Sequence, residues 1–191
     1  RSGAAYVYVL QDNAWIFQAK LIQPDPVINP DFGGSVAISG NTIVVGARGD
    51  IIGGVGTGSV YAFVRSASVW TLQQKIVAAD GTSGANFGRS VAVDGNTVVI
   101  GASGDQIQGS VYVFSRTGST WSQQAKVFDP PGLSSQFGYK VSVDADTVVV
   151  GNPFASFGGS GGGGVVCVYV RKNDSWAFQA RLAASDWAIG D

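Results

Sequence analysis

The sequence predicts an all-β protein of the β-propeller class, and two observations lead to this expectation: the composition and an internal repeat. The 191 residues include 28 glycines, and Glu, Met and His are absent. Glu and Met favour helices, whereas valine and aromatic residues favour strands and glycine favours turns. The repeat has a period of 50 to 55 residues. Units of that length with four short strands are typical of propeller blades.

Two motifs define the repeat. The first begins with Phe-Gly and reads FGGSVAISGNTIVVGA, FGRSVAVDGNTVVIGA and FGYKVSVDADTVVVGN, starting at Phe32, Phe87 and Phe137. The second is a short aromatic strand followed by a tryptophan, and its four copies carry Trp15, Trp70, Trp121 and Trp176. Since one copy of the second motif precedes the first Phe-Gly, the chain holds a half unit and then three full units. We expect the tryptophans to pack between blades rather than to form a ligand cage.

The second unit shows the four strands expected of each blade. Residues 90–94 alternate in size, as a pleated strand does, and residues 97–102 are a β-branched run typical of a strand covered on both faces. Residues 109–114 and 121–127 supply the third and fourth strands. The Asp-Gly-Asn sequence at 94–96 favours a tight hairpin, because its residues accept positive φ. Each unit therefore predicts a four-stranded antiparallel sheet.

We expect one propeller domain with an incomplete ring. It would comprise a half blade and linker at 1–31 and blades at 32–86, 87–136 and 137–191, the last with a tail. Closed propellers have about four to eight blades, and exposed sheet edges pair with other chains. We therefore expect further blades of a longer polypeptide, or other protein chains, to complete the ring.

The motifs Phe-Gly-x-Ser-Val-Ala, Val-Val-x-Gly-Ala and Gly-Ser-Val-Tyr-Val-Phe resemble FG-GAP repeats. These repeats are the blades of integrin α-subunit propellers and of many extracellular repeat proteins. The resemblance covers essentially the whole chain, and the pattern WxxQAKL in the fourth strand is similar to a short variant of the family. It implies a β-propeller fold and an extracellular or cell-surface location.

Blades of the integrin type bind calcium through an Asp-rich loop between their first two strands. The corresponding turns here lie at 39–41, 94–96 and 144–146. Calcium takes about six to eight oxygen ligands, more than such short turns supply. The sequence therefore predicts no cofactor and no metal site, with a weaker cation site at Asp50 or Asp105 as the alternative.

Residues 46–50 read GARGD and contain Arg48, Gly49 and Asp50, the tripeptide that integrins bind. The second unit reads GASGD at the matching place, so only Arg48 is peculiar to the first unit. The preferred interpretation is a Gly-Asp pair that shapes the loop after the second strand. Cell attachment through the tripeptide is the alternative.

The loops between the second and third strands vary in length, whereas the other turns are short and uniform. Varied loops on a rigid scaffold are the usual place of recognition in repeat proteins. We therefore predict ligand binding on the face where these loops emerge. The candidate residues there, besides the tripeptide, are Asp105, Asn152 and Phe154.

The charge balance argues against two classes of partner. Lys and Arg number 12 against 13 acids, a net charge of −1. This balance provides no basic surface for nucleic acid. No apolar run approaches the roughly 18 residues that a membrane span needs, so we expect no membrane insertion.

These observations favour a non-catalytic structural or adhesive module that mediates protein–protein assembly in a cell-surface, matrix or filament protein. A carbohydrate-binding propeller, with Tyr, Trp and Asp between its blades, is the alternative, and a fragment of an enzyme is a lesser one. Catalysis has little support because His and Glu are absent and the aspartates lie mostly in turns. We expect Cys167 to be a small buried side chain in a strand.

Overall fold

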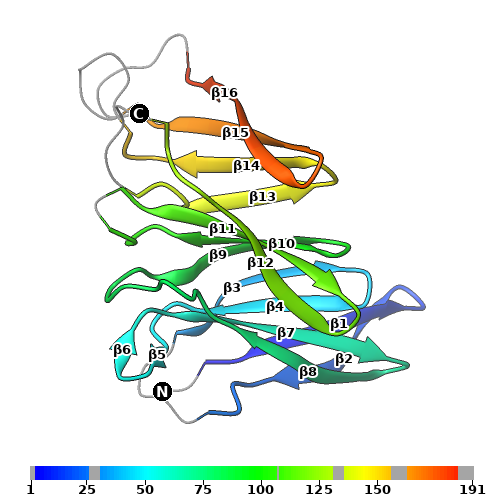
Figure 1. Ribbon diagram of the computed structural model, residues 1–191. Helices are drawn as coiled ribbons and strands as arrows, with labels where there is room; N and C mark the ends of the chain where they lie inside the picture. Colours follow the sequence, from blue (N-terminus) through cyan, green and yellow to red (C-terminus); the bar gives the residue numbers. More distant parts are fainter. Residues whose placement is uncertain (1–2, 26–30, 107, 131–135, 156–162, 185–191) are drawn as a thin grey trace.

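Sixteen strands and no helix make up the part of the chain that this computed structural model describes, residues 3–25, 31–106, 108–130, 136–155 and 163–184. The strands form three four-stranded antiparallel sheets, which we call the first, second and third blades, and two hairpins. The blades follow one another in chain order and do not close into a ring (Figure 1). The prediction of an incomplete propeller is confirmed.

Each blade is a meander whose neighbouring strands are consecutive in the chain, apart from one small hairpin in the first blade. The first blade consists of β3 (Phe32–Ser39), β4 (Thr42–Ala47), β7 (Ser59–Ser66) and β8 (Val69–Ile76). The second consists of β9 (Phe87–Asp94), β10 (Thr97–Ala102), β11 (Ser110–Thr117) and β12 (Thr120–Val127). The third consists of β13 (Lys140–Asp144), β14 (Thr147–Asn152), β15 (Val165–Lys172) and β16 (Ser175–Leu182).

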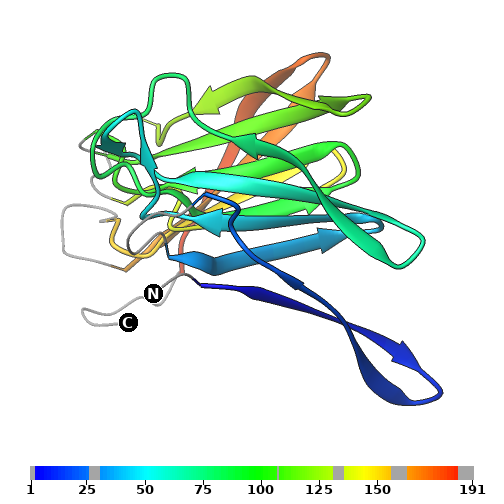
Figure 2. The same cartoon turned by 90° about the horizontal axis from the view of Figure 1, so that it is seen from below.

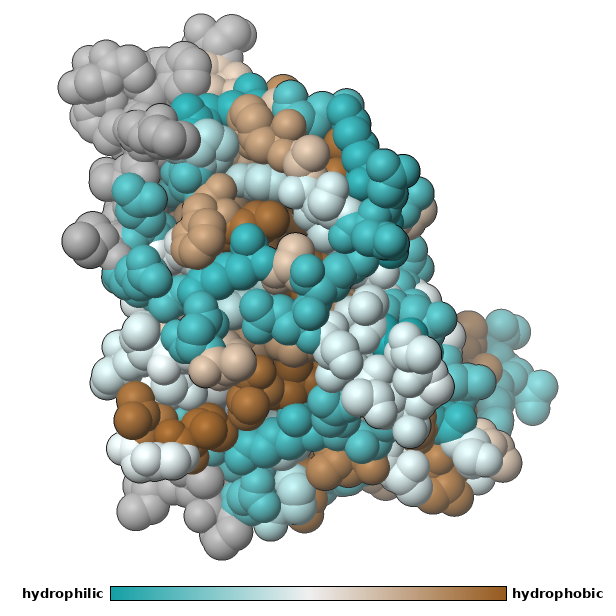
Figure 3. Space-filling view, viewed as in Figure 1, coloured by the Kyte–Doolittle hydropathy of each residue, from teal (hydrophilic) through white to brown (hydrophobic). Residues whose placement is uncertain are grey.

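Two hairpins stand outside the blades. The half blade consists of β1 (Ala5–Gln11) and β2 (Ala14–Leu21), and it extends away from the first blade with no further strand paired to β1 among the described residues (Figure 2). The short hairpin of β5 (Ile51–Ile52) and β6 (Val55–Gly56) lies in the loop after β4. Its exposed side chains contribute to an apolar patch at the lower left of Figure 3.

A β-bulge recurs between the third and fourth strands of every unit and connects the blades. In the second blade Val113 pairs with Ala125 and Phe114 with Gln123, so Gln124 is the extra residue. A bulge redirects one side chain of the strand. The extra residue of each unit accepts a hydrogen bond from the tryptophan of the next unit, over 2.7 Å, 2.9 Å and 3.1 Å respectively: Gln18 from Trp70, Gln73 from Trp121 and Gln124 from Trp176. The predicted packing of the tryptophans between blades is confirmed for these three, whereas Trp15 of the half blade is 69% exposed.

The hydrophobic core lies between adjacent blades. Phe87 and Val91 of the second blade pack in one buried cluster with Val44 and Val60 of the first blade. The ring of Phe87 meets that of Tyr112 edge to face, with centroids 5.2 Å apart. Burial of these side chains is the main force that holds the blades together, because hydrophobic stabilisation scales with the apolar area removed from water.

Close backbone approach between blades requires glycine. A Cβ atom on Gly46 would lie 2.1 Å from the carbonyl oxygen of Gly88, and one on Gly101 would lie 2.0 Å from that of Gly138. Both distances are far shorter than any real contact. The Phe-Gly turn of each blade therefore fits against a glycine in the second strand of the preceding blade.

Candidate functional site

The carboxylate of Asp50 lies at the centre of a buried polar cluster. Its exposed fraction is 0%. Ser59 Oγ donates to Oδ2 over 2.6 Å and Tyr61 Oη over 3.0 Å, while the amide of Ile51 donates to Oδ1 over 2.9 Å. Lys75 Nζ completes the cluster with an ion pair of 3.0 Å. The loop after β4 thus turns its acidic side chain inward.

This burial argues against the alternative of a cell-attachment tripeptide at Arg48, Gly49 and Asp50. Arg48 is exposed and pairs with Asp31, whereas the Asp50 carboxylate is enclosed by hydrogen-bond donors of its own blade. A receptor that engages both charges has no access to the acid. The Gly-Asp pair shapes the loop, as the preferred interpretation held.

The second blade repeats the cluster around Asp105, which is 1% exposed. Ser110 Oγ donates to it over 2.7 Å, and Lys126 Nζ pairs with it at 2.7 Å. A second acid, Asp80, comes from the loop that leaves the first blade. Lys126 Nζ lies 2.6 Å from Asp80 and Tyr112 Oη donates to Asp80 over 2.9 Å, so the cluster joins two blades.

The electrostatics of these clusters indicate a structural role. Burial by itself raises the pKa of Asp105, but hydrogen bonds from Lys126, Ser110 and Thr82 outweigh it and lower the pKa overall. Burial raises the pKa of Tyr112 to about 12. Each group is thereby held in its ordinary charge state at neutral pH, unlike a general acid or base, whose pKa lies near the working pH.

Sequence reasoning missed these clusters, although a signal was present. Asp50 and Asp105 occupy the same phase of the repeat, and Lys75 and Lys126 follow the tryptophans of the same two blades at a constant distance. Charged residues that recur in register on a strand bordering a core are candidates for a buried pair. The buried ion pairs were not predicted because Asp50 and Asp105 were assigned to loops, where aspartates commonly bond to the local backbone.

The third blade builds a different cluster at the same place. The residues that match Asp105, Ser110, Tyr112 and Lys126 are Ala155, Val165, Cys167 and Arg181. The acid comes from the preceding loop alone: Asp129 is 5% exposed and accepts from Arg181 Nη2 over 3.0 Å. Burial raises the pKa of Asp129 despite this cation. Cys167 is fully buried, as predicted, and burial also raises the pKa of its thiol, which disfavours the reactive thiolate.

The three candidate residues of the loop face have different environments. Asp105 and Asn152 are each 1% exposed, so the expectation that they face a ligand is wrong. The side chain of Asp105 turns inward to Thr82, Ser110 and Lys126. Phe154 is 49% exposed and packs edge to face against Tyr139, with ring centroids 5.7 Å apart.

The turns between the first two strands are in contact with arginines. The side-chain oxygen of one residue in each turn faces an arginine of the third strand: Asn41 with Arg65, Asn96 with Arg116, and Asp146 with Arg171. An oxygen engaged by a guanidinium is a poor ligand for a cation. Within the described ranges, no group of three Asp or Cys residues converges in a way that holds a metal ion.

The outer face of the first blade is open. Val36 and Ile38 of β3 are 57% and 60% exposed, whereas the matching Val91 and Val93 of β9 are each 8% exposed. Val91 and Val93 lie against the first blade. Val36 and Ile38 face a hollow of about 400 Å³ between β3 and the half blade. The half blade lacks the two inner strands that cover this surface elsewhere.

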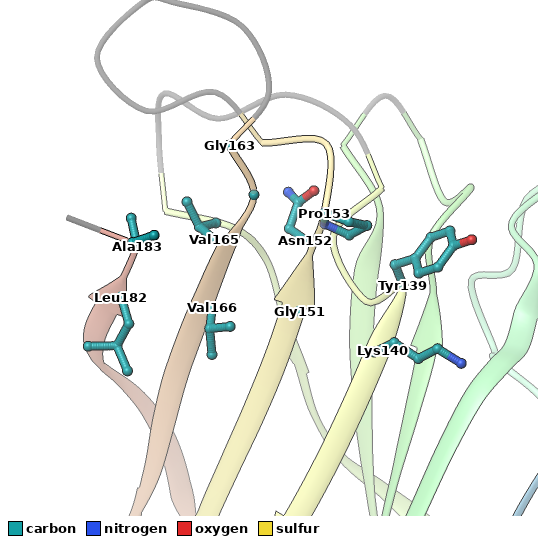
Figure 4. A pocket seen from close by; sticks show the side chains of 12 residues that line it. Tyr139, Lys140, Gly151, Asn152, Pro153, Gly163, Val165, Val166, Leu182 and Ala183 are labelled. Atoms are coloured by element: carbon teal, nitrogen blue, oxygen red, sulfur yellow. The ribbon is translucent and has the colours of Figure 1, made fainter. Parts of the chain in front are cut away.

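The outer face of the third blade is also open. Among the described residues, a Cβ atom on Gly151 would have Lys140 Cβ as its nearest neighbour, at 3.5 Å, and would meet no atom of another blade. A hollow of about 560 Å³ extends over this glycine and is bordered by Val165, Val166 and Leu182 (Figure 4). We call this surface and that of Val36 and Ile38 the two end faces.

The comparisons agree with the repeat architecture. Among the described residues, no helix has the length and apolar character needed to cross a membrane. No curated protein sequence matches the chain. A family model described as FG-GAP repeat matches residues 15–63, 70–114 and 121–169. Each match starts at the tryptophan of one unit and ends in the third strand of the next. Since these matches span more than half of the sequence, the chain belongs to the FG-GAP repeat family.

Proposed function

We propose that the protein is a non-catalytic structural or adhesive module of the extracellular space or cell surface. It mediates protein–protein assembly through its two end faces. The occupant of each end face is a further Phe-Gly blade, supplied by the same polypeptide or by another chain. The membership in the FG-GAP repeat family supports a β-propeller interaction module, and the end faces support the mode of assembly.

The observation that carries the proposal is the contrast between equivalent glycines. Gly46 and Gly101 each receive the Phe-Gly turn of the next blade, with no room for a Cβ atom. Gly151 occupies the same position in the third blade and lies open at a hollow. The surface that binds a Phe-Gly turn twice inside the molecule is therefore present a third time, and no described residue occupies it.

The tryptophan contacts lead to the same conclusion. Trp15 is 69% exposed, although its counterpart Trp121 is 3% exposed and donates to the bulged glutamine of the preceding blade. At the other end, Gln179 is exposed, although its counterpart Gln124 accepts from Trp176. Among the described residues, the Trp15 indole has no glutamine acceptor and Gln179 has no tryptophan donor. The two faces are thus complementary to adjacent blades of the same family.

Sedimentation velocity over a range of concentrations tests this proposal. We expect the 191-residue chain to associate at high concentration, because each end face exposes apolar side chains that a blade covers. Val36→Asp should weaken association at least about tenfold, since a buried unpaired charge is unfavourable. Ile51→Asp is the matched control, because Ile51 is 47% exposed and lies on the β5–β6 hairpin away from both end faces. A chain that stays monomeric, or equal effects of the two substitutions, would refute the proposal.

The carbohydrate-binding alternative has less support. The tyrosines between the blades, Tyr61 and Tyr112, are fully buried and donate to carboxylates, so they offer no open ring face to a sugar. An enzymatic role is likewise poorly supported, because Asp50 and Asp105 are neutralised by lysines and Cys167 has a raised pKa.

A further inference from the structure

A small hollow on the loop face collects cations from three blades. It has a volume of about 310 Å³ and lies where the first strands begin. Arg48 reaches it from the end of β4, Arg89 from β9 and Lys140 from β13. Asp31 is the one acid in its lining. We call this hollow the cationic pocket.

Two of its three cations are free of acidic partners. Arg48 forms an ion pair with Asp31. Within the described residues, neither Arg89 nor Lys140 lies within ion-pair distance of an acid. The pocket therefore carries a local excess of two positive charges in a protein whose net charge is −1. Such a focused charge raises the local concentration of anions.

The guanidinium of Arg89 is held in place by an aromatic ring. It lies 4.0 Å from the centroid of Tyr139, a cation–π contact that fixes its plane. Figure 4 shows the side chains of Tyr139 and Lys140 extending from the start of β13 toward the preceding blade, and both residues also border the hollow of the third blade's end face. The half-exposed ring of Phe154 packs edge to face against Tyr139.

We propose that the cationic pocket binds a carboxylate side chain, Asp or Glu, of an acidic peptide segment in a partner protein. A planar guanidinium matches a carboxylate through two parallel hydrogen bonds, and an arginine oriented in advance loses little entropy on binding. A peptide suits the pocket better than an acidic sugar. A sugar ring stacks on an open aromatic face, whereas Tyr139 is occupied by Arg89 and Phe154. The site goes beyond the proposed assembly through the end faces and does not depend on it.

Fluorescence anisotropy with a labelled peptide of six glutamates measures the binding directly. We expect saturable binding at about 50 mM salt that weakens at about 500 mM, because screening shortens the reach of exposed charges. Arg89→Gln and Lys140→Gln should each weaken binding about tenfold or more. Lys172→Gln is the matched control, since it removes one exposed positive charge from the last residue of β15, at the other end of the strands. Unchanged thermal unfolding of Arg89→Gln separates loss of the site from loss of the fold.

A second variant should bind the acidic peptide more tightly. Asp31→Asn removes the acid of the pocket and frees Arg48, and it keeps a residue type that accepts the positive φ of 54° found there. We expect the acidic peptide to bind a few times more tightly. The proposal is overturned if Lys172→Gln weakens binding as much as Arg89→Gln, if a six-glutamine peptide binds equally, or if an acidic oligosaccharide binds and the acidic peptide does not. Val36→Asp should leave peptide binding unchanged, which separates this site from the end face of the first blade.

Discussion

The second and third blades have closely similar sequence motifs but different surroundings. The second blade is covered on both faces: Val91 and Val93 lie against the first blade, and Gly101 lies against the turn of the third. The third blade is covered on one face, and Gly151 is open. Residues at equivalent positions therefore stabilise the contact between blades in one case and form an exposed surface in the other.

The polar clusters of these two blades differ in their number of acids and of hydrogen-bond donors. The second has two acids, Asp80 and Asp105, around one lysine, and each acid accepts several hydrogen bonds. The third has only Asp129, one of whose carboxylate oxygens is buried without a hydrogen-bond partner among the described residues. A buried carboxylate with few donors has a raised pKa, whereas one with many donors has a lowered pKa.

The largest expected effect comes from the equivalent glycines. Gly101→Ala should lower the free energy of unfolding by about 3 kcal/mol or more, because the new methyl group meets the Gly138 carbonyl oxygen at 2.0 Å and the blades must separate. Gly151→Ala should change it by less than about 0.5 kcal/mol, since the methyl group meets no other blade. Urea denaturation measures both. Similar losses in the two variants would contradict the account of the blade interface.

Removal of the central acid of the second blade should have the next largest effect. Asp105→Ala leaves Lys126 Nζ, Ser110 and Tyr112 with fewer acceptors at a buried site, and we expect a loss of roughly 2–3 kcal/mol in unfolding free energy. Asp174→Ala, in the exposed turn after β15, is the control and should be nearly neutral. If both variants unfold at the same urea concentration, the cluster contributes nothing to stability.

Acid should affect the two clusters in opposite directions. The pKa values of Asp80 and Asp105 are lowered in the folded protein, so their contribution is present above the ordinary carboxyl pKa of about 4 and is lost as the pH falls through the folded values. The pKa of Asp129 is raised, so its protonated form favours folding at low pH and this contribution is lost as the pH rises through the folded value.

Chemical denaturation from about pH 2 to about pH 7 distinguishes these cases. Relative to the parent protein, Asp105→Asn should lose most stability at neutral pH and little at pH 2. Asp129→Asn should show the reverse trend, so that its stability relative to the parent protein is highest at neutral pH. Parallel stability profiles for the two variants would show that the acids share one environment, contrary to the structure.

The smallest expected effect concerns the bulged glutamines. Gln124→Ala removes the acceptor of the Trp176 indole, which is 8% exposed, and should lower the free energy of unfolding by about 1 kcal/mol. Gln179→Ala changes an exposed residue at the matching position of the third blade and should have almost no effect on the isolated chain. Thermal unfolding of both variants tests the difference.

Much of the fold could be predicted from the repeat, and much of the candidate site could not. The Phe-Gly turns and the tryptophans were placed between blades from their phase alone, and the structure confirms this for Trp70, Trp121 and Trp176 but not for the exposed Trp15. The assignment of Asp105 and Asn152 to a ligand face failed because loop composition does not reveal the direction of a side chain. The cationic pocket was not predicted, since Arg48, Arg89 and Lys140 are far apart in sequence and share no motif.

The sequence by itself determined the strands, their grouping into blades and the order of the blades, because alternation, tight turns and a repeating motif act over short distances along the chain. Only the tertiary structure decided which equivalent residues are buried. Val36 and Val91 have the same neighbours in sequence, yet one is exposed and the other lies in a core. The physical reason is that burial depends on the next blade, and a residue's own strand carries no information about whether that blade is present.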